Sequence, residues 1–172
     1  MFSFVLLIFM SENITESTSK KVENGDTISV DYAGRLEDGT IFDTSIKETA
    51  IQAGLYNQMR DYKPLTFNVG AGQMIKGFDE GVVGMQVGEE KTLKIPPEEA
   101  YGEYNEELAR ELPINSVDFT PEVGMRLATD TGLTGIITKV NENSFVIDFN
   151  HNLAGKTLTF VVKIVSMEEH KG

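Results

Sequence analysis

Gln73-Met74-Ile75-Lys76-Gly77-Phe78-Asp79-Glu80-Gly81 stands near the middle of this chain of 172 residues and predicts the centre of its fold. From this stretch onward, apolar side chains recur at i, i+3, i+7 and i+10, in the order Ile75, Phe78, Val82 and Met85. That spacing places them on one face of an amphipathic helix. The sequence therefore predicts one short helix whose apolar face covers a core.

The segments on both sides of this helix have the period of β-strands. Residues 27–32 alternate, with Ile28, Val30 and Tyr32 on one face, which is typical of a half-buried strand. The other predicted strands are Ile41-Phe42, Leu65 to Val69, Thr92 to Ile95 and Leu158 to Ile164. Residues 46–62 break the alternation. The pattern predicts an α+β fold in which a mostly antiparallel sheet wraps around one short helix.

Residues 103–152 carry strands of their own. These are predicted at Arg126 to Ala128, Thr134 to Val140 and Ser144 to Asp148, with turn sequences between them. Three short apolar strands in one stretch predict a small all-β domain inserted before the last strand. Residues 106–112 have helical propensity by residue type.

Composition limits the possible functions. A hydrophobic content of 40% supports a packed core, and the absence of cysteine excludes disulfides and thiolate nucleophiles. The net charge of −12 repels phosphate backbones, so we expect no nucleic-acid partner. Metal binding is also not expected, because His151 and His170 are the only histidines. For His151 we predict a structural hydrogen bond.

The first ten residues are apolar, and the chain turns polar at Ser11. A membrane-spanning helix needs about 20 apolar residues, so this segment is too short to cross a membrane. Residues 1–9 are open to three interpretations: an upstream start before Met10, a weak anchor, or a signal. We expect residues 11–21 to form a flexible tail and the protein to be cytoplasmic and not bound to a membrane.

Five separate segments together suggest one binding pocket. They are residues 31–34, 41–45, 73–81, 97–102 and 158–160, and each places large apolar or aromatic side chains beside small or turn residues. Their central polar groups are the Asp43 carboxylate and the hydroxyls of Tyr32 and Tyr101. Such a set suits binding of an apolar, proline-like group and does not suit attack on a bond.

From Asp26 to Met167 these motifs follow the order and spacing of a known family. The chain resembles the FKBP-type peptidyl-prolyl cis-trans isomerases, in particular the short SlyD-like branch with an insert-in-flap domain. The resemblance implies an isomerase domain formed by residues 22–102 and 153–168. It also implies that residues 103–152 are an insert-in-flap, chaperone-like domain, preceded at residues 1–21 by the apolar start and the tail. The family would place a strand near Arg110 to Pro113, where residue type favours a helix, so the conformation of this segment stays open.

The same resemblance implies roles for individual residues. Tyr32, Asp43 and Tyr101 would be catalytic, and the substrate-binding residues would be Phe42, Leu65, Met74, Ile75, Phe78 and Phe160. The proline ring would sit on Phe78, while the Tyr101 hydroxyl and the Ile75 N–H would bond substrate carbonyls. Asp43 would polarise the pocket near the twisting amide, although a structural hydrogen bond or an ion pair with Arg or Lys remains an alternative.

No cofactor is implied, because rotation about an X–Pro bond needs neither proton transfer nor a covalent intermediate. The barrier of about 18–20 kcal/mol comes from amide resonance. A protein lowers it by moving the bond out of water and by favouring the twisted form. Two positions depart from well-known members of the family, since Phe78 replaces a frequent Trp and Leu65 a frequent Phe. Both stay apolar, so we expect catalysis to survive and macrolide inhibitors to be possible ligands.

The expected partners are unfolded or partly folded polypeptides that contain proline, and we expect the chain to be a monomer. Residues 103–152 hold nine acidic and three basic side chains, so client capture there would rely on apolar groups and open strand edges. The apolar candidates are Leu108, Leu112, Ile114, Phe119 and Leu133, and core packing is an equally open role for each. The alternative function is a holdase or proline-binding module with little catalysis.

Overall fold

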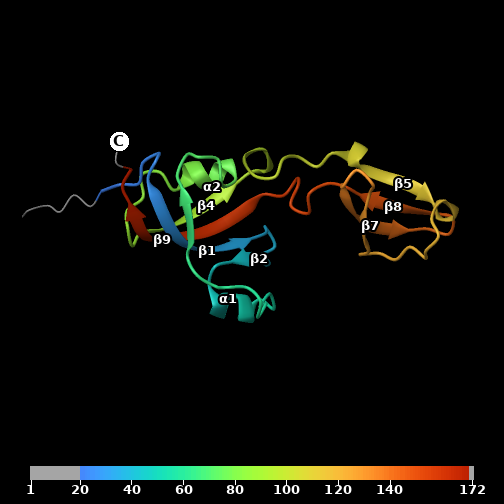
Figure 1. Cartoon of the computed structure of the whole chain (residues 1–172), viewed down its shortest axis with the longest axis horizontal. Coiled ribbons are helices and arrows are strands. Elements are labelled where there is room, and N and C mark those ends of the chain that lie inside the picture. The colour runs from blue at the N-terminus through green and yellow to red at the C-terminus, as the bar shows by residue number, and fades with distance from the viewer. Residues whose placement is uncertain (1–19, 171–172) are drawn as a thin grey trace, which may run out of the picture.

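The computed structural model describes residues 20–170. In this range five strands form the larger sheet (Figure 1). They are β1 (Thr27–Arg35), β2 (Ile41–Thr44), β3 (Leu65–Asn68), β4 (Glu90–Ile95) and β9 (Leu158–Glu168). Strand β1 pairs antiparallel with β2, β3 and β9, and β9 also pairs antiparallel with β4. The α+β prediction is confirmed, while the interpretations of residues 1–9 and most of the predicted tail lie outside the described residues.

The core lies between this sheet and helix α2 (Lys76–Gly81). Alternate residues of β1, among them Ile28 and Val30, are buried, and so are Val162 and Ile164 of β9. Val30 lies opposite Ile164 in the β1–β9 register. Burial of each such side chain stabilises the fold by roughly 1.5–3 kcal/mol, so the alternating pattern is enough to fix which face of the sheet meets the helix.

Helix α2 is shorter than the sequence predicts. It ends at Gly81, whereas Val82 and Met85 follow in a turn and are still buried. Gly84 has a φ of 84°, in the left-handed region that favours glycine, and its N–H donates to the Val22 carbonyl. Gly81 and Gly84 therefore end the helix early. Val82 and Met85 still reach the core, but from a turn and not from a helix.

Residues 46–62 contain a second helix, α1 (Lys47–Gln52), which projects from the sheet in Figure 1. Of its residues only Ala50 is buried. The chain then runs without regular structure to β3. The break in strand alternation thus marks an irregular segment with one short helix.

Residues 103–152 form a second sheet with strand order β5-β8-β7-β6. Its strands are β5 (Ala109–Pro113), β6 (Arg126–Ala128), β7 (Thr134–Val140) and β8 (Ser144–Asp148), so the three predicted strands are confirmed. The open question at residues 106–112 is answered by a 3-10 turn at Glu106–Leu108 followed by β5, which pairs with β8. Further 3-10 turns are Pro97–Glu99 and Ile114–Ser116.

This second sheet has a core of its own, formed by Ile137, Phe145 and Ile147. In Figure 1 it lies to one side of the larger sheet along the long axis. Two connecting segments reach it from the larger sheet, and a hydrogen bond from the Gly155 N–H to the Gly102 carbonyl joins them. Within residues 20–170, no helix is long and apolar enough to cross a membrane.

Candidate active site

One cavity of about 360 Å³ opens between the larger sheet and α2. That size is within the range of small-ligand sites in proteins. The residues that line it come from β1, β2, the segment before α2, α2 itself, the turn after Pro97–Glu99, and β9. They are Tyr32, Phe42, Asp43, Gln73, Met74, Ile75, Phe78, Tyr101 and Phe160.

Aromatic rings form the floor and walls of the cavity. Phe78 is only 1% exposed and meets Phe160 edge to face, with ring centroids 5.2 Å apart and planes at 85°. Tyr32 packs on Phe78 in the same manner at 6.2 Å, and Phe42 on Phe160 at 5.5 Å. Edge-to-face contacts of this kind are favourable beyond the burial of area, so the rings hold one another in place. The cavity is therefore preformed and apolar.

Strand register brings these rings together. Gly34 of β1 lies opposite Phe160 of β9, and the rings of Phe42 and Phe160 pack directly over the Gly34 backbone. A side chain at position 34 would occupy the space of both rings, so the glycine is required by close packing.

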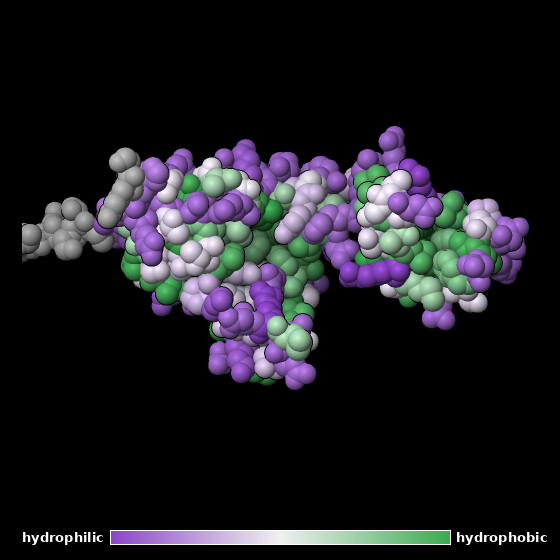
Figure 2. Space-filling view, in the orientation of Figure 1, coloured by the Kyte–Doolittle hydropathy of each residue, from purple (hydrophilic) through white to green (hydrophobic). Residues whose placement is uncertain are grey.

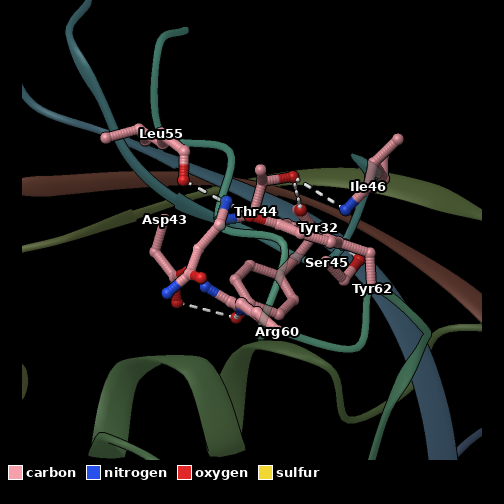
Figure 3. A network of polar contacts seen from close by, with 9 residues as sticks. Tyr32, Asp43, Thr44, Ser45, Ile46, Leu55, Arg60 and Tyr62 are labelled. Carbon is pink, nitrogen blue, oxygen red and sulfur yellow. Dashed lines mark hydrogen bonds and ion pairs between the residues drawn. The ribbon is translucent and has the colours of Figure 1, made fainter. Parts of the chain in front are cut away.

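A polar network at the rim holds the Asp43 carboxylate (Figure 3). The Tyr32 hydroxyl donates to Asp43 Oδ2 at 2.7 Å, and the Thr44 N–H donates to Oδ1 at 2.9 Å. Arg60 forms an ion pair with Asp43, with Nη1 2.6 Å from Oδ1, and its Nη2 lies 3.3 Å from the Tyr32 hydroxyl. Burial, together with the hydrogen bond to Asp43, raises the pKa of Tyr32 to about 12. Tyr32 therefore stays protonated as a donor at neutral pH.

A second layer of hydrogen bonds fixes the backbone of Tyr32. Its carbonyl accepts from the Thr44 hydroxyl at 2.7 Å, and its N–H donates to the Ser45 hydroxyl at 3.0 Å. The Ser45 hydroxyl in turn donates to Asp31 at 2.9 Å. These bonds tie the Tyr32 backbone to Thr44 and Ser45, the two residues that follow Asp43 in the chain.

The structure brings eight of the nine predicted site residues into this cavity. The exception is Leu65 of β3, which lies opposite Val30 of β1. Leu65 packs against the core and, with Tyr32 and Arg60, lines a neighbouring depression. Strand β3 pairs with residues 27–30 of β1, whereas β2, whose Phe42 and Asp43 line the cavity, pairs with residues 33–35, so Leu65 lies at a different point along β1.

Sequence reasoning did not name two residues of the site: Gln73, which lies within a predicted pocket segment, and Arg60, which lies outside all of them. Gln73 lies beside the predicted Met74 and lines the cavity, while its Oε1 accepts the Asn68 N–H at 2.8 Å. Because Met74 and Ile75, which follow Gln73 directly, were predicted to bind substrate, the sequence indicated that Gln73 lies near the pocket. Arg60 stands in the irregular segment after α1, where no pattern marks it. The ion pair between Arg60 and Asp43 matches the alternative role predicted for Asp43. Asp43 also lines the cavity, as the resemblance implies.

The lining offers little reactive chemistry. Asp43 is the single charged side chain among the lining residues, and no Ser, Thr, Cys, Lys or His side chain lies among them. Across residues 20–170, no three His, Asp or Glu side chains gather so that they could hold a metal ion. An apolar, preformed cavity with one fixed carboxylate and a few hydrogen-bond donors suits non-covalent binding of a compact apolar group.

Sequence comparisons agree with this geometry. The family model described as FKBP-type peptidyl-prolyl cis-trans isomerase matches residues 18–165. A short-type peptidyl-prolyl cis-trans isomerase of Methanocaldococcus jannaschii is 44% identical over 146 residues, which cover 83% of this chain and 92% of that protein. The FKBP-type isomerase SlyD of Pasteurella multocida is 34% identical over 154 residues, which cover 87% of this chain and 70% of that protein.

A third relative, a probable FKBP-type 16 kDa peptidyl-prolyl cis-trans isomerase of Pseudomonas fluorescens, is 30% identical over 154 residues. The match covers 87% of this chain and 93% of that protein. Matches of this extent include both the pocket and residues 103–152. The chain therefore belongs to the FKBP-type peptidyl-prolyl cis-trans isomerases and catalyses rotation about the peptide bond that precedes proline.

Proposed function

We propose that the enzyme binds the proline ring of its substrate above Phe78 and lowers the rotation barrier without a covalent step. One observation carries this proposal: eight residues chosen from the sequence line a single apolar cavity whose one charged lining group is Asp43. The planar amide is the more polar form of the bond, because resonance separates charge between oxygen and nitrogen. Transfer from water to an apolar cavity disfavours that form relative to the twisted one.

Hydrogen-bond donors at the rim would orient the peptide on both sides of the proline. The Tyr101 side chain is 41% exposed, and its hydroxyl has no partner within residues 20–170. The Ile75 N–H, just before α2, likewise donates to no group in that range. Both are free to donate to substrate carbonyls, while Asp43 is held at the rim of the cavity by Tyr32 and Arg60. Fixed donors stabilise a twisted amide without reorganising.

Substitutions at the rim test this mechanism on a short Xaa-Pro peptide. We expect Asp43→Asn to lower kcat/KM about tenfold, and Tyr101→Phe to lower it about threefold to tenfold, as for one hydrogen bond of about 0.5–1.5 kcal/mol. Tyr56→Phe, at an exposed tyrosine that stacks on Tyr62, is the matched control. If both rim variants keep the activity of the control, the proposed roles are wrong.

We further propose that residues 103–152 form a domain that holds unfolded client chains. Leu108, Phe119 and Leu133 are more than a third exposed there, and Figure 2 shows apolar surface on this part of the molecule. Strands β5 and β6 are the edges of its sheet, where an extended chain can add by backbone hydrogen bonds. Leu112 and Ile114, in contrast, are partly buried and pack against the second core, so they offer less surface to clients.

A variant without the second sheet separates catalysis from client binding. Residues 106–147 would be replaced by a short Gly-Ser loop, which can close because Asn105 and Asn150 are joined by hydrogen bonds of 2.9 Å in both directions. We expect peptide isomerisation to survive in this variant and proline-limited refolding of an unfolded protein to collapse. Refolding at the full rate would contradict the client-binding role.

The alternative, a holdase or proline-binding module with little catalysis, makes a different prediction for the intact chain. It would suppress aggregation while accelerating neither peptide isomerisation nor refolding. A monomeric state, macrolide binding and a cytoplasmic location stay predictions from the sequence.

A further inference from the structure

A parallel stack of two rings joins the cavity to the segment by which residues 103–152 return to the larger sheet. The rings of Tyr101 and His151 have centroids 4.0 Å apart and planes only 3° apart. Tyr101 lines the cavity from the turn after Pro97–Glu99, and His151 stands in the segment between β8 and β9. The stack therefore connects the outgoing and the returning chain beside the pocket.

Tyr101 has few other constraints. It lies in a turn, its side chain is substantially exposed, and its hydroxyl is unpaired within the described part of the chain. A side chain in such a place has several rotamers open to it, and a hydrogen bond to substrate would have to overcome that freedom. The stack on His151 restricts the ring before substrate arrives.

His151 is also exposed, but hydrogen bonds restrain both its ring and its backbone. Its Nδ1 accepts the Leu153 N–H at 3.1 Å, which confirms the predicted structural hydrogen bond, and its carbonyl accepts the Ala154 N–H at 2.8 Å. Four residues after His151, the Gly155 N–H donates to the carbonyl of Gly102, the residue that follows Tyr101. The imidazole is thus a fixed surface beside a side chain that is otherwise free to turn.

We infer that His151 is a positioning residue for the isomerase reaction, because its ring holds Tyr101 in the orientation that lines the cavity. This inference rests on the proposed role of the Tyr101 hydroxyl. The hydrogen bond from the Leu153 N–H to His151 shapes the local turn. The stack of the two rings, in contrast, orients the Tyr101 hydroxyl. A preoriented donor loses less conformational entropy when substrate binds, so kcat/KM depends on the ring of His151.

Two substitutions separate the ring from the hydrogen bond. His151→Phe keeps a flat ring for Tyr101 but has no acceptor for the Leu153 N–H. His151→Asn keeps an acceptor that can bond the N–H two residues on, as in an Asx turn, but has no ring. On an Xaa-Pro peptide, we expect His151→Asn to lose about threefold to tenfold in kcat/KM, the range for an aromatic pair, and His151→Phe to recover most of it.

A lower kcat/KM in His151→Phe than in His151→Asn would overturn the inference, because the effect of His151 would then come from its hydrogen bond in the turn. Thermal unfolding of both variants shows whether each is folded at the assay temperature. The effect must also pass through Tyr101. In a Tyr101→Ala background, His151→Asn should cause no further loss, and an undiminished loss there would equally overturn the inference.

A spectroscopic measurement distinguishes failure of this inference from failure of the proposed function. The chain has two histidines, so the imidazole proton signals of His151 are identified by their loss in His151→Asn. In the intact protein we expect these signals to be shifted by the Tyr101 ring and to move in Tyr101→Ala. Signals that do not move would disprove the stack. Signals that move, with full activity in Tyr101→Ala, would instead disprove the role of Tyr101 in the reaction.

Discussion

The Arg60 guanidinium lies 2.6 Å from the Asp43 carboxylate, and this ion pair ties β2 to the irregular segment after α1. The two side chains are 43% and 37% exposed, so water screens the pair, and its contribution to stability is at most about 1 kcal/mol. Its importance lies in orientation. It fixes one oxygen of the carboxylate at the pocket rim, while Tyr32 binds the other.

Loss of this ion pair should impair catalysis more than stability. We expect Arg60→Ala to lower kcat/KM on an Xaa-Pro peptide about threefold to tenfold, because Asp43 loses one of its fixed partners, and to change the free energy of unfolding by less than about 1 kcal/mol. Lys63→Ala is the control, since Lys63 pairs with Asp61 and both are largely exposed. Equal kcat/KM in the two variants would disprove the orienting role of Arg60.

Tyr32 should make stability fall at high pH. Its pKa is raised to about 12 by burial and by the hydrogen bond to Asp43, whereas an unfolded tyrosine titrates near 10. The contribution is therefore complete below about pH 10 and is lost as the pH rises from about 10 to 12, with a total of about 3 kcal/mol.

Urea unfolding from about pH 9 to about pH 12 measures this dependence. In Tyr32→Phe we expect the corresponding part of the decline to disappear. Tyr56→Phe, at an exposed tyrosine, should leave it in place. A Tyr32→Phe curve parallel to that of the unaltered protein would show that Tyr32 titrates alike in both states.

Gly34 should be required for the shape of the pocket. An added Cβ would lie 2.7 Å from ring atoms of both Phe42 and Phe160, so Gly34→Ala must displace the rings. We expect a higher KM for peptide and a loss of stability of about 1–3 kcal/mol. The matched control is Gly135→Ala in the second sheet, where the Cβ would lie 2.7 Å from Ile147. It should destabilise the protein without changing KM, and a similar KM for the two variants would contradict the argument.

Asp26 should contribute stability that is lost in acid. The N–H groups of His170 and Glu23 donate to its buried carboxylate, and these bonds lower the pKa of Asp26. The contribution is therefore present above the unfolded pKa of about 3.9 and is lost as the pH falls through the lower folded value.

We expect Asp26→Asn to cost about 1–2 kcal/mol near neutral pH and to flatten the acid side of the stability curve. Urea unfolding at a series of acidic pH values measures both effects. The exposed Asp61→Asn serves as control. An acid dependence as steep in Asp26→Asn as in Asp61→Asn would show that the carboxylate of Asp26 is not linked to folding.

The strands and the turn-rich connections of this protein were predictable because burial leaves a local period in the sequence. Alternating apolar residues in β1 and β9 mark the face that meets α2, and the same rule identified three strands of the second sheet. The prediction was wrong about the length of α2, because apolar residues at helical spacing can also be buried from a turn. Val82 and Met85 keep helical spacing but are buried from a turn, because Gly81 and Gly84 end α2 early.

Periodicity along the sequence sufficed for the α+β fold and the second sheet, because it is a property of neighbouring residues, while the family resemblance supplied eight of the residues that line the cavity. Tertiary packing was needed for the rest. It placed Leu65 outside the cavity, brought Arg60 to Asp43 and stacked His151 on Tyr101. Such contacts join residues far apart in the chain through strand register, loop path and side-chain rotamer, and none of these leaves a repeating pattern that can be read along the sequence.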